Sequence, residues 1–214
     1  MLDFGFYNED CMKGMKEFPD KYFDLAIVDP PYGINAGKMN MGSGKHLFNN
    51  NKTWDESIPS SDYFSELFRV SKMQVIWGGN YFTQYLKPSP HWLVWDKKNP
   101  HLSFAEGELA WMNDGNNLRI FHFYTVQQTM EGRKIHPTQK PIELYDWILR
   151  NYAEPGYKIL DTHVGSASSL IACKRLNFDF VGFEIDKEYY RLACERIARE
   201  TAQMTLTQYL GEMT

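Results

Sequence analysis

The chain is poor in cysteine, in long apolar runs and in motifs that bind metal ions. Its only cysteines, Cys11, Cys173 and Cys194, are widely spaced and form no CxxC pair, which argues against a disulfide framework and for a reducing compartment. The six histidines show no metal-ligand spacing, so no metal is expected. No apolar run reaches membrane-spanning length, and residues 1–20 are too charged for a signal peptide. These absences predict a cytoplasmic protein with no membrane partner.

Positive charge is also scarce, because the chain carries a net charge of −4. Nucleic-acid binders usually present a basic face, so the total charge argues against such a partner. Basic residues do gather locally, and each group taken alone is most simply a solvated surface. The groups are Lys38, Lys45 and Lys52; Lys97 and Lys98; and Arg133, Lys134 and Lys140.

What the chain does have is enough apolar sequence for one sizeable domain, with 43% hydrophobic residues among 214. Apolar, β-favouring runs alternate with amphipathic segments, which predicts an α/β fold with a mixed, mostly parallel sheet flanked by helices. Strands are expected at 2–7, 22–28, 73–77, 91–95, 108–112, 119–124, 157–160 and 179–183. Helices are expected at 11–18, 60–71, 141–152, up to 175 and 187–201.

A catalytic motif is expected where the buried strand 22–28 ends, at Asp29, Pro30, Pro31 and Tyr32. Ligands of open α/β sheets bind at the carboxyl ends of the strands, and proline cannot continue a central strand. A carboxylate, a rigid carbonyl and an aromatic ring together suit a planar heterocycle that carries an exocyclic amine. The alternative is an ordinary Asp-Pro-Pro turn after a strand.

A second acidic group is expected around the strands 157–160 and 179–183. The first strand delivers Asp161, followed by the small-residue loop 162–168, and the second delivers Glu184, 23 residues later. A strand, such a loop and a helix N-terminus form a nucleotide-cradling element, and an acid after the second strand is placed to bind ribose hydroxyls. The loop lacks both GxGxxG and GK[ST], which argues against nicotinamide and P-loop sites. An acid before the loop suits a cofactor with a positive group, such as S-adenosylmethionine, and the alternative is a plain βαβ crossover.

Two polar segments are expected to serve the substrate. Residues 33–59 form a long loop directly after Tyr32, and a loop of that length is unusual unless it is functional or mobile. We expect it to be a mobile substrate loop. Residues 125–135 form a short polar segment before His136.

The combination and order of these motifs resembles the β group of DNA amino-methyltransferases, in the form found in phage-type members. The resemblance rests on Asp29 to Tyr32, on 136–141 with the sequence His-Pro-Thr-Gln-Lys-Pro, and on 161–168 with Glu184. It implies a single Rossmann-like, S-adenosylmethionine-dependent methyltransferase domain over 1–214. It also implies that the substrate is adenine N6 in double-stranded DNA, because Asp before Pro-Pro-Tyr is usual in those enzymes. The resemblance further implies a bacterial or phage-infected bacterial cell, and a homodimer, because dimers are usual among relatives with this motif order.

The resemblance also implies a role for each motif residue. Asp29 and the Pro30 carbonyl would hold the target amine, and Tyr32 would stack on the flipped base. Residues 125–135 would be the short target-recognition segment, and the basic groups would contact phosphates. The residues assigned to the cofactor are Asp10, His136, Thr138, Lys140, Asp161, His163, Gly165, Ser166 and Glu184.

The cofactor loop departs from the family pattern Asp-Pro-Phe-x-Gly-Ser-Gly-Thr at four positions, namely Thr162, His163, Ala167 and Ser168. Ala167 in place of Gly leaves the loop less able to adopt a positive φ, which is expected to weaken cofactor binding without abolishing it. Two alternatives stay open. One is a methyltransferase that acts on RNA or on a protein glutamine amide. The other is a non-catalytic DNA-binding partner that kept the fold.

Overall fold

The computed structural model describes residues 1–38, 52–99, 105–124 and 134–211, and for 203–211 it describes the backbone alone. In chain order the principal elements are β1 (Gly5–Tyr7), α1 (Cys11–Met15), β2 (Phe23–Val28), α2 (Ser61–Val70), β3 (Ser71–Trp77), β4 (Trp92–Asp96), β5 (Gly107–Met112), β6 (Arg119–His122), α4 (Ile142–Tyr152), β7 (Lys158–Asp161), α5 (Ser168–Arg175), β8 (Asp179–Phe183) and α6 (Lys187–Gly211). Short 3₁₀ turns lie at Ala36–Lys38 and Gly79–Tyr81.

The strands form one sheet in the order β1-β8-β7-β2-β3-β5-β4-β6. The strands β1, β8, β7, β2 and β3 are parallel to one another, whereas β5 runs antiparallel to both β3 and β4. The predicted mixed, mostly parallel sheet is therefore confirmed. The strands β5 and β6, which residues 113–115 connect, do not pair with each other. Both edges of β5 are already taken by β3 and β4, so β6 pairs with the free edge of β4, in parallel.

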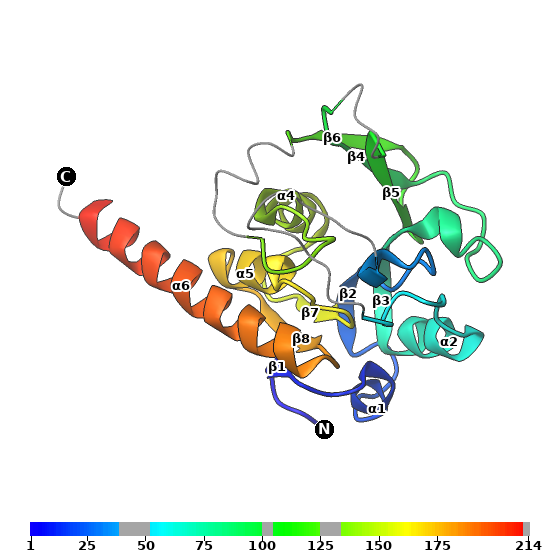
Figure 1. Cartoon of the computed structure of the whole chain (residues 1–214), viewed down its shortest axis with the longest axis horizontal. Coiled ribbons are helices and arrows are strands. Elements are labelled where there is room, and N and C mark those ends of the chain that lie inside the picture. Colours follow the sequence, from blue (N-terminus) through cyan, green and yellow to red (C-terminus); the bar gives the residue numbers. More distant parts are fainter. Residues whose placement is uncertain (39–51, 100–104, 125–133, 212–214) are drawn as a thin grey trace.

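Helices cover both faces of the sheet (Figure 1). Alternate residues of β2 point to opposite faces: Leu25 and Ile27 pack in the cluster with α4 and α5, whereas Ala26 and Val28 pack in the cluster with α1 and α2. Because both faces are covered, β2 is buried almost throughout. The long helix α6 extends away from the sheet toward the C-terminus (Figure 1) and runs beyond the predicted end at 201.

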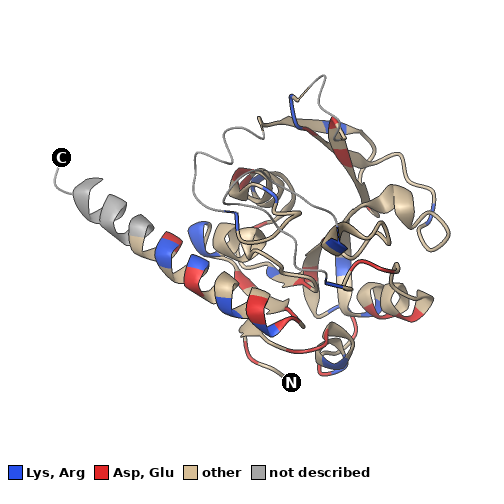
Figure 2. Cartoon of the chain, viewed as in Figure 1, with Lys and Arg blue, Asp and Glu red and all other residues tan. Residues whose placement is uncertain are grey.

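Charges of both signs alternate along the described side chains of α6 (Figure 2). Within the described ranges, no helix has the combination of length and apolar character needed to cross a bilayer. In the same part of the chain, no three His, Cys, Asp or Glu side chains are grouped as metal ligands.

Candidate active site

The site lies where the connections of the sheet change direction. From β2 the chain continues through α2 to β3, whereas from the adjacent β7 it continues through α5 to β8 on the other side. Such a switch point leaves a crevice at the carboxyl ends of the strands. Asp29 follows β2, Asp161 ends β7 and Glu184 follows β8. The three predicted acids therefore share one edge of the sheet.

A cavity of about 200 Å³ opens at this edge. Nine of the residues predicted for the site line it: Asp29, Pro31, His136, Thr138, Lys140, His163, Gly165, Ser166 and Glu184. The other four, Asp10, Pro30, Tyr32 and Asp161, do not line it. The Asp-Pro-Pro motif and the cofactor loop thus border the same space, although more than 130 residues separate them in the sequence.

Both carboxylate oxygens of Asp29 accept hydrogen bonds from protein side chains. The Tyr32 hydroxyl donates to Oδ1 at 2.5 Å, and Lys140 Nζ donates to Oδ2 at 2.5 Å. Burial raises the pKa of Asp29 although the Lys140 ammonium opposes that effect. A ligand amine that bonds to this carboxylate therefore competes for its lone pairs with two donors that are already in place.

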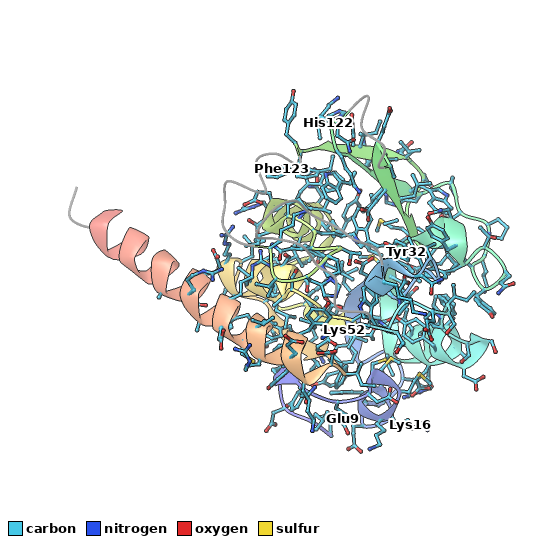
Figure 3. The ribbon with its side chains drawn as sticks, viewed as in Figure 1. Glu9, Lys16, Tyr32, Lys52, His122 and Phe123 are labelled. Atoms are coloured by element: carbon cyan, nitrogen blue, oxygen red, sulfur yellow. The ribbon has the colours of Figure 1, made fainter. Side chains whose placement is uncertain are left out.

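The Tyr32 ring is held on two sides. It stacks on Tyr81, with ring centroids 4.9 Å apart and an angle of 14° between the planes. Gly78 lies directly against it, since a Cβ at that position would approach Tyr32 Cε1 to 2.2 Å. Gly78 also adopts φ +70, which a residue with a side chain rarely takes. Tyr81 is 42% exposed, so its ring is the accessible part of this stack. Tyr32 itself lies in the centre of the molecule, whereas His122 and Phe123 lie far from it, at the β6 end (Figure 3).

Lys140 connects Asp29 to a further carboxylate, Glu108 of β5. Its side chain is 1% exposed, and Nζ lies 3.0 Å from Glu108 Oε2. Although burial opposes the charged form, Asp29 and Glu108 raise the pKa of Lys140. Burial likewise opposes the ionised form of Glu108, but Lys140 and Lys97 lower its pKa to about 2. The resemblance placed Lys140 at the cofactor. The structure places its ammonium on the carboxylate of the catalytic motif, although the residue also lines the cavity.

The two acids of the cofactor element have different partners. Asp161 is 3% exposed and accepts hydrogen bonds from His163 N at 3.0 Å and from the Ser169 hydroxyl. Glu184 accepts hydrogen bonds from Gly165 N at 2.9 Å and Asp186 N at 2.8 Å. Among the residues that the structure describes, neither acid forms an ion pair with a lysine or arginine. Burial raises the pKa of Asp161 to about 7 and also raises that of Glu184.

The cofactor loop adopts left-handed backbone at two positions. Gly165 has φ +52, and Ala167, which caps α5, has φ +64 despite its side chain. Ala167 was expected to adopt a positive φ less readily than glycine, but it has a positive φ in this structure, with its side chain fully buried. A Cβ at Gly165 would lie 3.7 Å from the His136 ring. The loop backbone therefore faces the His136 wall of the cavity closely.

Aromatic rings form that wall. The His136 ring packs against Trp54 and Tyr189, with centroids 5.1 and 4.3 Å away. Thr138 Oγ1 lies 3.1 Å from His136 Nδ1. Burial, assisted by Lys140 and Lys52, lowers the pKa of His136 to about 3. The ring is therefore neutral at physiological pH and offers an apolar face to the cavity.

Asp10 lies beside α1 rather than in the wall of the cavity. Its Oδ1 accepts a hydrogen bond from Met12 N at 2.8 Å and so caps the N-terminus of that helix. A contact between Asp10 and the adenine of a cofactor stays a prediction.

Sequence reasoning missed three residues that shape the site: Trp54, Asp55 and Glu108. Asp55 is 2% exposed, and its carboxylate accepts hydrogen bonds from the backbone N–H groups of Tyr32, Gly33 and Ala36 at 2.6, 2.9 and 2.8 Å. It thereby fixes the turn that follows the catalytic motif. It stands in a polar stretch without periodicity, so no local signal distinguishes it.

Both ends of the predicted substrate loop 33–59 are anchored. Asp55 holds the first end, and Lys52 pairs with Asp186 and Glu188 at 2.8 and 2.9 Å. The middle of that loop, 39–51, lies outside the described residues, as does 125–133 of the expected recognition segment.

Most lysines that were candidates for phosphate contacts already pair with carboxylates. Lys38 pairs with Glu56, Lys97 with Glu108 and Lys98 with Asp96. Lys140 is buried, so a phosphate contact predicted for it is wrong for this conformation. Lys45 and Arg133 lie outside the described residues.

The donor set of the second acidic group fits S-adenosylmethionine. Asp161 and Glu184 are buried or half-buried and have no lysine or arginine partner in the part of the chain that the structure describes, so they suit a ligand with an ammonium and a sulfonium. The turn at Gly165 brings backbone close to the cavity, and Ile185, which is 68% exposed, adds an apolar surface to the lining. The residues present thus provide charge complementarity, hydrogen-bond acceptors and apolar surface for such a cofactor.

Comparison with known proteins gives a consistent result. A family model described as DNA methylase matches residues 94–195. The chain is 27% identical over 231 residues to the Type II methyltransferase M.HpaI of Haemophilus parainfluenzae, covering 89% of this chain and 73% of that protein. Its fold is similar to that of the M1.HpyAVI-SAM complex, with a TM-score of 0.60, 20% identity and coverage of 89% and 98% of the two chains. It is also similar to the cytosine-N4-specific PvuII DNA methyltransferase, with a TM-score of 0.59, 13% identity and coverage of 94% and 92%.

Proposed function

We propose that this chain, an S-adenosylmethionine-dependent methyltransferase of the DNA methylase family, methylates N6 of an adenine that is flipped out of duplex DNA. The observation that carries the proposal is the shared cavity: Asp29 and Pro31 border it together with Gly165 and Glu184. Substrate amine and cofactor would therefore meet in one space at the carboxyl edge of the sheet.

The chemistry of the amine explains the need for Asp29. An aromatic amine is a poor nucleophile because its lone pair is delocalised into the ring. When the Asp29 carboxylate and the Pro30 carbonyl accept its two hydrogens, the nitrogen pyramidalises and its lone pair points toward the cofactor side of the cavity. S-adenosylmethionine supplies the electrophilic methyl group. The proton that the amine loses passes to Asp29, whose pKa burial raises above the ordinary value.

Base flipping gives the amine access to this carboxylate, because pairing in the duplex hides it. Tyr32 would stack on the flipped base. Since its ring stacks on Tyr81 in this structure, the base would take the place of the exposed Tyr81 ring. The Tyr32 hydroxyl already bonds to Asp29, so the stacking ring and the acceptor carboxylate are held as one unit.

The cofactor would bind on the side of Asp161 and Glu184. Asp161 would face the ammonium, Glu184 would accept hydrogen bonds from the ribose, and Asp10 would reach the adenine. The remaining predicted contacts are His136, Thr138, Lys140, His163, Gly165 and Ser166, all of which line the cavity.

In the family that the chain resembles, Asp before Pro-Pro-Tyr is usual in adenine N6 enzymes and Ser is usual in cytosine N4 enzymes. Asp29 therefore favours adenine over cytosine. The fold does not decide this choice, since a cytosine-N4-specific enzyme shares it. We further propose one catalytic domain over 1–214, a homodimer, and a place in the cytoplasm of a bacterial or phage-infected bacterial cell. In that setting the enzyme would mark DNA either beside a restriction enzyme or alone.

The test is incorporation of tritiated methyl from S-adenosylmethionine into unmethylated duplex DNA, followed by nucleoside analysis. N6-methyladenine is expected, and N4-methylcytosine would overturn the choice of base. If no methyl enters DNA but calorimetry shows cofactor binding, RNA or a glutamine amide becomes the substrate. If neither occurs, the chain is a non-catalytic partner with a methyltransferase fold.

A further inference from the structure

A chain of alternating charges, centred on the buried Lys140, ends at the carboxylate of Asp29. Lys140 Nζ lies 2.5 Å from Asp29 Oδ2 and 3.0 Å from Glu108 Oε2. The other oxygen of Glu108, Oε1, lies 2.6 Å from Lys97 Nζ. The four residues come from four separate segments: the turn after β2, the stretch before α4, strand β5 and the stretch after β4. None of the family motifs in the sequence includes Glu108 or Lys97.

The two carboxylates do not compete equally for Lys140. Glu108 has two ammonium groups beside it, and its pKa falls to about 2 even though burial opposes ionisation. Asp29 shares one ammonium with Glu108 and has the Tyr32 hydroxyl besides, and its pKa is raised. Lys140 therefore has in Glu108, which Lys97 also anchors, a second carboxylate partner that stays in place when Asp29 takes another donor.

We propose that Glu108 is a positioning residue. It shares the Lys140 ammonium with Asp29, so that Asp29 can exchange the lysine N–H for the N–H of the target amine while Lys140 keeps a carboxylate partner. This inference rests on the proposed function, because it concerns the carboxylate that would hold the amine. Removal of one partner from a buried ion pair leaves an uncompensated charge. With Glu108 in place, Lys140 keeps a carboxylate partner when Asp29 turns to the substrate.

Without Glu108, the Lys140 ammonium would have Asp29 as its only carboxylate partner among the described residues. Asp29 would then be held in a tight buried pair, and the incoming amine would have to break it. A residue with a merely structural role would lower stability when changed but would leave the ionisation of Asp29 where it was. The pH at which Asp29 titrates therefore distinguishes a positioning role of Glu108 from a merely structural one.

The experiment uses Glu108→Gln, which keeps the shape and removes the charge. In the variant, the carboxyl 13C titration of Asp29, assigned with Asp29→Asn, is expected to move to lower pH, because Lys140 is no longer shared. Lys97→Met is expected to move it to higher pH, because Glu108 then draws Lys140 away. The other groups that face Asp29 stay the same in both variants: Tyr32, Tyr63, Tyr145 and Asp161.

Kinetics give the second readout. For Glu108→Gln we expect kcat for DNA methylation to fall by about 10- to 100-fold, the acid limb of its pH profile to move to lower pH, and the dissociation constant of S-adenosylmethionine to change less than about threefold. Glu108→Asp is expected to restore part of kcat. The matched control is Glu66→Gln, a half-buried glutamate that pairs with Arg69 at 2.7 Å in α2, away from the site. It is expected to leave kcat and the pH profile unchanged.

The outcomes separate this inference from the proposed function. If the Asp29 titration stays in place in both variants, the inference is overturned whether or not the protein methylates DNA. If the titration moves in opposite directions in the two variants but the wild-type protein transfers no methyl group to DNA, the coupling stands and the proposed substrate fails. If Glu108→Gln does not fold, the Lys97→Met titration alone decides.

Discussion

Two acidic groups share the carboxyl edge of the sheet, and the protein treats them in opposite ways. Asp29 and Glu108 are paired with lysines inside the protein. Asp161 and Glu184 accept hydrogen bonds from backbone and hydroxyl groups, and among the described residues neither pairs with a lysine or arginine. The difference indicates that Asp161 and Glu184, rather than Asp29 and Glu108, are suited to bind a cationic ligand. The lysines favour the ionised form of Asp29 and Glu108, the lysine-paired group, whereas within the described residues Asp161 and Glu184, the unpaired group, have no lysine or arginine partner that would compete with a cationic ligand.

The contrast also fits the two tasks that we propose for these carboxylates. A carboxylate that must accept a neutral amine has to be ionised before the substrate arrives, so a fixed ammonium beside it is useful. A carboxylate that must bind a cationic ligand loses affinity if a protein cation already occupies it. The following variants remove one side of the contrast at a time.

The largest effect is expected from Asp29→Ala, which removes the acceptor from the lysine-paired side. Methyl transfer should fall by roughly 10³-fold or more, because a group that stabilises the transition state is lost. The dissociation constant of S-adenosylmethionine should stay nearly unchanged, since the cofactor acids are intact. Single-turnover methylation and calorimetry measure the two quantities. Retained turnover would remove Asp29 from the proposed mechanism.

The next effect is expected from Glu184→Ala on the unpaired side. Loss of charge-assisted hydrogen bonds should weaken cofactor binding by about 10- to 100-fold, that is by roughly 1.5–3 kcal/mol. At saturating cofactor, kcat should recover, because the amine acceptor is untouched. Calorimetry with Glu184→Gln as the conservative partner checks this. An unchanged dissociation constant would show that the ribose binds elsewhere.

Asp161→Asn is expected to change how the dissociation constant of the cofactor depends on pH. Burial raises the pKa of Asp161 from 3.8 to about 7, so in the free wild-type protein the carboxyl is partly protonated near neutrality. A cationic ligand binds the ionised form, so the wild-type dissociation constant should rise as pH falls below 7, whereas that of the variant should be weaker and less dependent on pH. Calorimetry between about pH 5.5 and about pH 8.5 measures both dissociation constants.

The same substitution has a consequence for stability, with a sign that follows from the raised pKa. The folded protein retains the proton of Asp161 up to about pH 7, whereas the unfolded chain loses it near 3.8. The stabilising contribution is therefore complete below that lower pH and is lost as pH rises through 7. Asparagine does not ionise, so the Tm of the free variant should exceed that of the wild type by an amount that grows from pH 4 to pH 7. A constant difference would contradict the raised pKa.

Much of the fold, Asp29 of the lysine-paired group and both acids of the unpaired group were predictable from the sequence, because those features are local. The strand that precedes Asp29 and the strand that precedes Glu184 are short apolar runs, and each places its acid at the carboxyl edge of the sheet. The partners of those acids were not predictable in this way. Glu108 meets Lys140 only because β5 inserts between β3 and β4, and no local pattern encodes that order.

The site also depends on contacts across long sequence separations. Asp55 caps a turn that begins 23 residues before it, and a carboxylate in a polar stretch gives no sign of such a role. Trp54 and Tyr189 reach the wall of the cavity because the stretch before α2 and the first turn of α6 both meet the His136 ring there. In each case the residue type was visible in the sequence, but the neighbour that gives it a role was set by tertiary packing.

The smallest effect is expected from Ala167→Gly, at the cofactor loop beside the unpaired acids. Glycine relieves a left-handed backbone strain of about 1–2 kcal/mol, but it removes a methyl group that is fully buried, which costs about 0.8 kcal/mol. It also raises the entropy of the unfolded chain by roughly 0.4–1 kcal/mol. Because these terms nearly cancel, the free energy of unfolding should change by less than about 1 kcal/mol, and cofactor affinity by less than about threefold, since the backbone already has the conformation that glycine would take. Denaturation and calorimetry measure both, and a tenfold gain in affinity would mean instead that the loop binds the cofactor in a conformation that Ala167 resists.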